Sequence, residues 1–168
     1  MPRVYAIDGI VPVVEPSAFV HPSAVLIGDF GRIVVEEGAN IQDGCMLHGF
    51  PGKDTVVGAE ATVGHGAILH GNAEIGEDAV VAALAFVKAE ARIPARSLAA
   101  GIPARVLREL SEEEIRWKRD NMALYQQLAV RSATTMKEVE ALTRVEPGRP
   151  RIEIPGSVPL SELKRKHG

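Results

Sequence analysis

The sequence predicts an all-β solenoid, a coil of short strands that turns a corner every six residues, followed by a C-terminal α-helix. Branched apolar residues recur at every sixth position, and a small residue, usually alanine, precedes each of them by two positions. An α-helix repeats near 3.6 residues and a flat strand near two, so a period of six fits neither alone. It fits short strands that each point one apolar side chain into a coil. The seven rungs of this ladder are Val57, Val63, Leu69, Ile75, Val81, Val87 and Ile93.

Residues 1–16 are expected to form an extended lead-in, punctuated by Pro12 and Pro16. The solenoid is expected over residues 17–105, since the six-residue spacing can also be traced backward from Val57. Three extra residues around 30–32 and four around 49–52 interrupt the count. A stacked core cannot absorb insertions, so both are predicted to bulge outward as loops.

Residues 106–145 are expected to hold the C-terminal helix, which begins at Ser111. Ser111 and Glu114 have the S-x-x-E spacing of a capping box. Apolar residues at spacings of three, four or seven then predict one stripe that packs on this solenoid or on a neighbouring subunit's. Residues 146–168 are expected to form an extended tail. The stripe comprises Ile115, Met122, Tyr125, Ala129, Met136 and Val139.

The composition of the 168-residue chain favours one cytoplasmic domain. Its partner is expected to be a small-molecule substrate, with no nucleic acid and no membrane. The net charge of -3 provides no strong electrostatic attraction for nucleic acid or an anionic membrane. No apolar segment has the length of a membrane span, and the N-terminal residues lack the apolar core of a signal peptide. The single cysteine, Cys45, excludes an intramolecular disulfide and favours a reducing compartment.

Two histidines directly follow inward-pointing rungs, His48 after Leu47 and His70 after Leu69. They lie 22 residues apart, and without the four inserted residues the separation is 18, which is one coil of three six-residue sides. Both side chains are therefore predicted to point outward, one above the other, at the strand spacing of about 4.8 Å. Two imidazoles at that separation can chelate one metal ion.

A third histidine, His65, lies on the preceding side of the coil, two residues after Val63. Five extended residues span about 16 Å, so His65 is expected to point away from the stacked pair. The simplest way to bring it to the same ion is from another subunit. A three-fold ring would then hold three shared sites, each with three histidines and one open position, which is a catalytic arrangement for zinc.

Several stretches carry a family resemblance: FVHPSAVLIGD, FGRIVVEEGANIQDGCMLHGFPGKDTVVG, VGHGAILHG, and GIPARVLREL with the SEEE segment after it. With these motifs the chain resembles the γ-class carbonic anhydrases, and most closely their phenylacetic-acid-degradation and carnitine-operon branch. The resemblance implies a left-handed parallel β-helix of hexapeptide repeats that assembles as a homotrimer. It also implies metal sites shared between subunits, with zinc as the metal and iron or cobalt as alternatives.

By the same resemblance, His48, His65 and His70 are the metal ligands, with His65 supplied by the neighbouring subunit. Gln42 would hydrogen-bond the metal-bound water or the substrate, and Asp43 would belong to the interface network. For Gln42 and Asp43 the alternative is a structural hydrogen bond at a corner of the coil.

Two further catalytic candidates follow from the resemblance. Asp29 matches the aspartate of the family's Arg-x-Asp pair, and Tyr125 matches a helix tyrosine that lies near the site in relatives. The alternative for Asp29 is again a turn hydrogen bond, and for Tyr125 it is helix packing. Asn40 is expected to point outward beside Gln42.

The chain departs from this branch in three respects. Ile27 stands where the Arg-x-Asp pair has its arginine, which in relatives pairs with acidic groups at the subunit interface. About one 18-residue coil is absent between Leu26 and Asp29, and another between Gly71 and Ala85, so the stack stays in phase. The proton-shuttling acidic loop of the best-studied members is replaced by a short loop at 49–54.

Four functions agree with these features. The leading hypothesis is a zinc-type enzyme in which metal-bound hydroxide hydrates carbon dioxide, with activity weakened by the departures. The second is a metal-dependent thioesterase for CoA esters, because this branch is associated with acyl-CoA catabolism. The third is a hexapeptide-repeat acyltransferase with histidine as general base and no need for a metal. The fourth is a non-catalytic homologue, and the fold alone does not decide among them.

Overall fold

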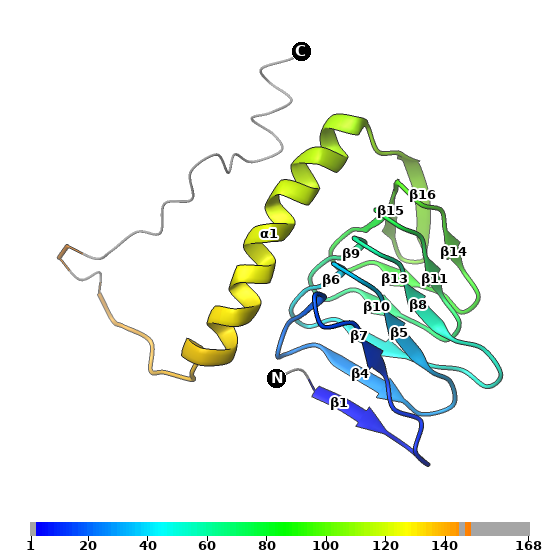
Figure 1. Cartoon of the computed structure of the whole chain (residues 1–168), viewed down its shortest axis with the longest axis horizontal. Helices are drawn as coiled ribbons and strands as arrows, with labels where there is room; N and C mark the ends of the chain where they lie inside the picture. The colour runs from blue at the N-terminus through cyan, green and yellow to red at the C-terminus, as the bar shows by residue number, and fades with distance from the viewer. Residues whose placement is uncertain (1–2, 145–146, 149–168) are drawn as a thin grey trace.

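The chain folds as a left-handed parallel β-helix of about five coils with one long helix beside it (Figure 1). This computed structural model describes residues 3–144 and 147–148. Each coil contributes one strand to each of three sheets, and neighbouring strands within a sheet come from successive coils. The solenoid predicted from the six-residue period is therefore confirmed.

Three sheets form the sides of the coil. The first sheet consists of β1 (Arg3–Ala6), β4 (Val25–Gly28), β7 (Met46–His48), β10 (Ile68–Leu69) and β13 (Phe86–Val87). The second sheet consists of β2 (Val13–Val14), β5 (Ile33–Val35), β8 (Thr55–Val57), β11 (Glu74–Ile75) and β14 (Arg92–Ile93). The third sheet consists of β3 (Phe19–Val20), β6 (Asn40–Ile41), β9 (Thr62–Val63), β12 (Val80–Val81), β15 (Ser97–Gly101) and β16 (Ala104–Glu109).

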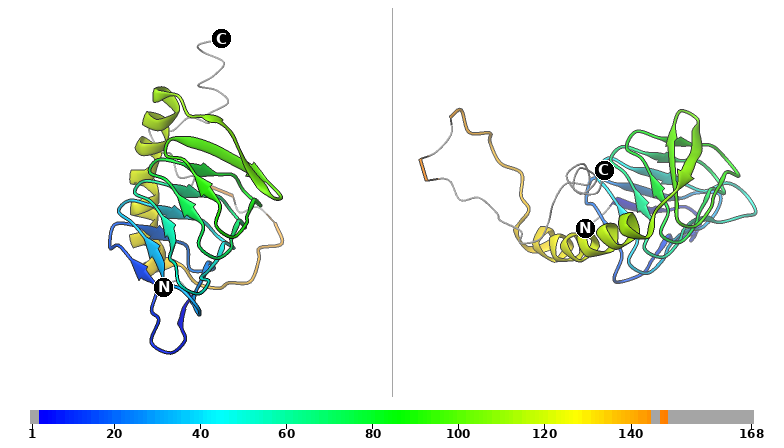
Figure 2. Two further views of the ribbon diagram at one scale, coloured as in Figure 1. Left: turned by 90° about the vertical axis from the view of Figure 1, so that its right-hand side faces the viewer. Right: turned by 90° about the horizontal axis from the view of Figure 1, so that it is seen from above.

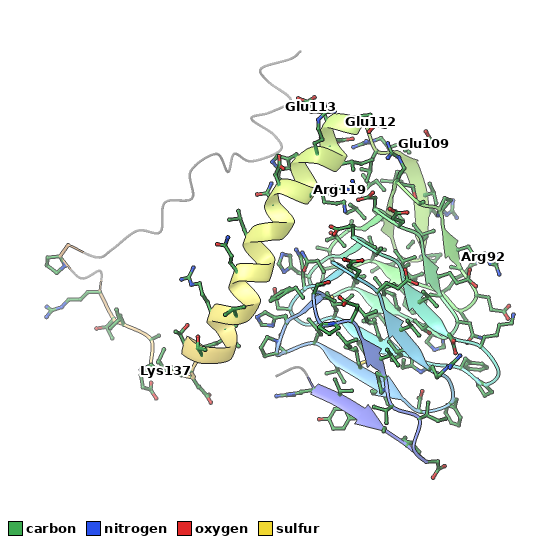
Figure 3. All side chains as sticks on the ribbon, in the orientation of Figure 1. Arg92, Glu109, Glu112, Glu113, Arg119 and Lys137 are labelled. Atoms are coloured by element: carbon green, nitrogen blue, oxygen red, sulfur yellow. The ribbon has the colours of Figure 1, made fainter. Side chains whose placement is uncertain are left out.

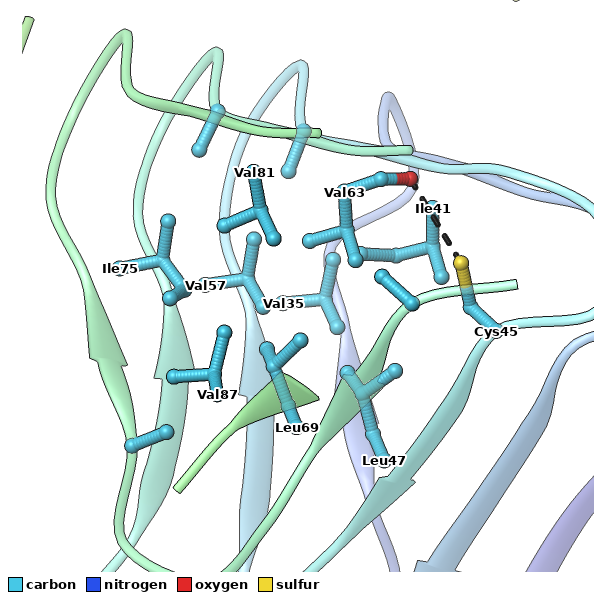
Figure 4. Close-up of a cluster of buried hydrophobic side chains, with 14 of the residues drawn as sticks. Val35, Ile41, Cys45, Leu47, Val57, Val63, Leu69, Ile75, Val81 and Val87 are labelled. Carbon is cyan, nitrogen blue, oxygen red and sulfur yellow. Dashed lines mark hydrogen bonds between the residues drawn. The ribbon is translucent and has the colours of Figure 1, made fainter. Parts of the chain in front are cut away.

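The rungs fill the inside of the coil as one continuous apolar column (Figure 4). Each rung stacks in register on the rung of the next coil, as Leu47 does on Leu69 and Leu69 on Val87. Complete burial of one such side chain contributes about 1.5–3 kcal/mol, so this column is the main source of the fold's stability. Cys45 occupies a small-residue position, and burial raises the pKa of its thiol to about 11. The thiol therefore stays protonated at neutral pH.

The corners of the coil repeat a left-handed backbone conformation every six residues. This conformation reverses the chain within a few residues, which allows one two-residue strand to follow another directly. It costs a residue with a side chain roughly 1–2 kcal/mol, so each corner depends on the rungs around it. Beyond glycine, the positive φ angles between 56° and 61° belong to Glu60, Asn72, Asp78, Leu84, Glu90 and Arg96.

Both insertions bulge from the coil as the sequence predicts. Phe30 and Phe50, one in each loop, remain 63% and 48% exposed. The loops lie against each other through glycine backbones, because a Cβ on Gly49 would lie 2.3 Å from the carbonyl oxygen of Gly31. A larger residue at Gly49 would force the two loops apart.

The outer boundaries differ from the expectation. Residues 1–16 contain β1 and β2, which pair in parallel with β4 and β5, so the solenoid begins before residue 17. At the other end, residues 106–109 belong to β16, which folds back antiparallel onto β15 and covers the edge of the last coil. The helix α1 (Glu112–Thr135) is accordingly shorter than the expected 106–145. Of the expected tail at 146–168, only residues 147–148 are described.

The helix α1 lies along the third sheet of its own solenoid and runs from the β16 end back to β3 (Figures 1 and 2). Its predicted capping box is confirmed, since Ser111 Oγ accepts the N–H of Glu114 and Glu114 accepts the N–H of Ser111. The predicted stripe ends with the helix, because Met136 and Val139 lie beyond it and are exposed. Among the described residues, no helix has the length and apolar character needed to cross a bilayer.

A buried ion pair holds α1 to the solenoid. The Lys118 ammonium lies 3.0 Å from Asp78 and also donates to the carbonyl oxygen of Glu60, and both charged side chains of the pair are less than a tenth exposed. Arg119, on the side of α1 that faces the solenoid (Figure 3), donates to the same carboxylate. Burial opposes ionisation of Asp78, but the hydrogen bonds from Arg119 and Lys118 outweigh it and lower its pKa.

Candidate metal centre

The two histidines that follow rungs are stacked as the ladder predicts. β7 and β10 pair in parallel with Leu47 opposite Leu69, which brings His48 and His70 to neighbouring positions on the outer face of the first sheet. Their ring centroids lie 4.4 Å apart with the rings perpendicular. This separation is close to the strand spacing, as the ladder predicts.

Asp29 lies beside one of these rings, in the neighbouring coil. Its Oδ2 lies 3.3 Å from His48 Nδ1, while its Oδ1 accepts the backbone N–H groups of Phe30 and Gly49. Burial opposes ionisation of Asp29, but these N–H groups and the nearby His48 outweigh it and lower its pKa. His48 Nδ1 is nevertheless buried without a hydrogen-bond partner among the described residues, so the carboxylate makes only an ionic contact with this ring.

His65 has a carboxylate partner of its own at a different corner. It lies in the turn between β9 and β10, and its Nδ1 is 2.5 Å from Asp43 Oδ1. This hydrogen bond is the main cause that lowers the pKa of Asp43. The buried Gln42 side chain accepts the backbone N–H of His65 at 3.2 Å. His65 itself is 56% exposed, so its ring faces outward from the molecule.

The sequence-predicted residues thus form two separate groups in one chain. His48, His70 and Asp29 lie where the first and second sheets meet, and the other group of His65, Asp43 and Gln42 lies where the third and first sheets meet. Among the residues that the structure describes, no group of three or more His, Cys, Asp or Glu side chains is placed to hold a metal ion within a single chain. The backbone of Tyr125 lies in α1, but its side chain is outside the described part of the structure.

The outer face of the first sheet between these two groups is apolar. The register places Val25, Met46, Ile68 and Phe86 in one outward row. Met46 and Ile68 are 42% and 39% exposed, unusually open for large apolar side chains in a contiguous row. Ile27 pairs with His48 in the neighbouring row.

Two aromatic residues beside the stacked histidines were not among the predicted site residues. The rings of Phe50 and Phe86 lie 6.2 and 6.1 Å from the His70 ring. Phe50 comes from the inserted loop, and a Cβ on Gly71 would lie 2.5 Å from it, so glycine there permits the contact. The place of Phe50 two residues after His48 was a signal for this contact that sequence reasoning left unused.

Comparisons with known proteins show which family the chain belongs to. No family model matches the chain, so the family is shown by individual relatives. The carnitine operon protein CaiE of Salmonella agona (strain SL483) is 44% identical in a match that is 184 positions long, gaps included. The match covers 89% of this chain and 93% of that protein. CaiE of Escherichia coli (strain K12) is 43% identical over 184 residues, with 89% and 94% covered.

Solved structures share the coil. A hexapeptide transferase family protein from Anaplasma phagocytophilum is 28% identical with a TM-score of 0.53, and the match covers 76% of this chain and 96% of that one. The N-acyltransferase AntD from Bacillus cereus has a TM-score of 0.57 at 14% identity, covering 71% and 72%, a likeness of fold alone.

The length of the sequence match also bears on the missing coils. Because 89% of 168 residues is about 150, a match over 184 residues leaves about 34 positions of CaiE without a counterpart in this chain. That deficit is close to two coils of 18 residues, which is the shortening expected from the resemblance. With its five-coil solenoid and this identity along most of its length, the chain belongs to the CaiE family of hexapeptide-repeat proteins.

Proposed function

We propose that the protein is a homotrimeric metal-dependent enzyme whose sites lie between subunits, each formed by His48 and His70 of one chain and His65 of the next. The observation that carries the proposal is the stacking of His48 on His70, together with a carboxylate beside His48 and another bonded to His65. His48 Nδ1 faces Asp29 and His65 Nδ1 faces Asp43, at 3.3 and 2.5 Å. The hydrogen bond from Asp43 fixes the ring of His65 and leaves its Nε2 for the metal, whereas Asp29 makes only an ionic contact with His48.

The outer face of the first sheet supports the three-fold arrangement. An exposed apolar row through Met46 and Ile68 favours burial in an interface. The stacked pair lies at one margin of this sheet and His65 at the other. A cyclic, head-to-tail interface joins two different margins of the same surface, which is the relation that a shared site requires.

In the proposed site each residue has a distinct task. A zinc ion bound there would lower the pKa of a water molecule to about 7, which supplies a nucleophile for carbon dioxide. Asp43 orients the ring of His65, Asp29 places a negative charge beside His48, and Gln42 holds the backbone of His65. Phe50 and Phe86 supply apolar neighbours to the His70 ring.

Subunit mixing tests the shared site directly. His65→Ala removes one side of each site, and the double variant His48→Ala/His70→Ala removes the other. Neither variant alone should bind metal tightly. Random trimers from equal amounts of the two should regain about one site in four, because only one order of neighbours in a head-to-tail ring is complete. Metal content by elemental analysis is the measurement, and failure of the mixture to regain metal would contradict the shared site.

The reaction is tested on the metal-loaded protein. We expect carbon dioxide hydration above the uncatalysed rate in the zinc-, cobalt- or iron-loaded protein, and no excess rate in His65→Ala. Bound metal without carbon dioxide hydration would reject this activity. The metal-dependent thioesterase would then be the reaction to test. Release of free thiol from a panel of acyl-CoA esters then measures the thioesterase alternative, which the carnitine operon name of the relatives favours.

Acyl transfer is a second candidate, favoured by the hexapeptide transferase family protein at 28% identity. In that case His48 or His70 would act as general base without a metal. Acyl transfer that survives a strong chelator but is lost in His70→Ala would support this candidate. Loss of activity on chelation, with recovery on adding metal, would exclude it.

A further inference from the structure

A cavity of about 180 Å³ lies between α1 and the third sheet, away from the stacked histidines. Its floor comes from the outward positions of four strands and its roof from one face of α1. Trp117, the only tryptophan of the chain, contributes to the roof. The lining residues are Asn40, Gln42, Thr62, Val80, Leu98, Arg108, Leu110, Glu114, Trp117, Lys118 and Asn121.

One buried polar atom of this lining lacks a partner. The Asn40 side chain is 1% exposed, and its Oδ1 has no hydrogen bond to any described residue. A buried acceptor without a donor costs about 1–3 kcal/mol, so a cavity that contains one favours an occupant that can donate. Asn40 therefore marks where the donor of a ligand would lie.

The charges around the cavity are already matched. Arg108 donates twice to Glu114, at 2.7 and 2.8 Å, and Lys118 is paired with Asp78 at 3.0 Å. A charged ligand would meet pairs that are neutral as a whole and would lose its hydration without a counter-charge. The occupant that fits is therefore uncharged.

The size and the walls complete the description of the ligand. Val80, Leu98 and Trp117 form an apolar part of the lining, which offers water no hydrogen-bond partner. A cavity of about 150 Å³ in another protein holds a benzene molecule, so the space here suits one six-membered ring.

We propose that this cavity binds a neutral, ring-sized molecule that donates one hydrogen bond to Asn40 and packs against Trp117. The inference is independent of the metal centre and of the reaction assigned to it. Gln42 nevertheless connects the two places, because it lines the cavity and also accepts the backbone N–H of His65. An occupant of the cavity would therefore lie next to a residue of the candidate metal centre.

Cyclohexanol and cyclohexanone make a matched pair of probes for the full-length protein. They are alike in size, but only the alcohol donates a hydrogen bond. We expect saturable millimolar binding of cyclohexanol in ligand-detected NMR and a saturable change in the fluorescence of Trp117. Cyclohexanone should bind up to tenfold more weakly, as expected for one hydrogen bond. Binding that does not saturate, or equal affinities for both probes, would overturn the proposal and leave a water-filled space.

Two variants and a control locate the binding. Asn40→Leu should remove the preference for the alcohol, while Val80→Phe should fill the cavity and abolish binding of both probes. Val56→Phe is the control, because Val56 occupies the corresponding outward position on the second sheet, outside this cavity. Circular dichroism establishes that each variant is folded. Binding that persists in folded Val80→Phe would place the probe elsewhere and reject the site.

Discussion

At the scale of single residues, the orientation of a side chain depends on its position relative to the nearest rung. Leu47 points into the coil, so the next residue, His48, points outward. There it lies beside His70, which follows the paired rung Leu69. The same rule places Asn40 and Gln42, on either side of Ile41, beneath α1. Two kinds of single-residue change test these orientations.

Asp29→Asn should weaken metal binding by about 10- to 100-fold, because the negative charge beside the ligand His48 is lost. Competition with a chelator of known affinity measures the change. Asp54→Asn is the matched control, since Asp54 lies in the neighbouring loop and pairs with the exposed Arg32. Equal effects of the two substitutions would remove Asp29 from the proposed site.

Ile75→Ala should destabilise the solenoid by about 2–5 kcal/mol, because Ile75 is 2% exposed and its truncation leaves a cavity between coils. Ile7→Ala, at a position that is 49% exposed, should cost less than about 1 kcal/mol. Urea unfolding followed by circular dichroism compares them, and similar midpoints for both variants would contradict the continuous core.

At the scale of elements, α1 has two separate determinants. The capping box sets where the helix begins, and the ion pair of Lys118 with Asp78 sets how it packs. The first is local and can be read from four consecutive residues. The second joins residues 40 positions apart, at a corner of the coil and on the helix.

Ser111→Ala should cost about 1 kcal/mol of helix stability, because the N–H of Glu114 loses its acceptor. Ser132→Ala, the same substitution in the last turn of α1, should be close to neutral. The fluorescence of Trp117 in urea reports on the helix. A cost no greater than that of Ser132→Ala would show that the cap contributes nothing to docking.

Asp78→Asn should destabilise the docked helix by about 3 kcal/mol or more, since the buried Lys118 would lose the carboxylate that it is paired with at 3.0 Å. The pKa of Asp78 is lowered in the folded protein, so its contribution is present at neutral pH and above about pH 4, the unfolded value. It is lost as the pH falls through the lower folded value.

Urea titrations of Trp117 fluorescence at pH 7 and in acid measure both effects. The variant should show a smaller loss of stability in acid than the parent protein does. Glu74→Gln, which breaks an exposed pair with Arg92, serves as the surface control. The same acid response in the parent and in Asp78→Asn would contradict the role of this carboxylate.

At the scale of the whole molecule, the proposed trimer makes the metal site a property of the assembly. Ile68→Glu should place a charge in the apolar face of the first sheet, convert trimers to monomers and release the metal. Val56→Glu, on the second sheet, should leave both the mass and the metal content unchanged. Light scattering and elemental analysis measure the two quantities. A metal-containing monomer would contradict the proposed sharing of His65.

The sequence alone determined the coil, its two outward loops, the stacked pair of His48 and His70 and the first residue of the helix, because each depends on local periodicity or a local hydrogen bond. Only the tertiary structure decided that residues 3–14 pair with the second coil and that 104–109 form a strand, since short strands are defined by their partners. It also decided which carboxylate meets which histidine. Asp29 reaches His48 across 19 residues and Asp43 reaches His65 across 22, and such contacts exist only once the coils are stacked.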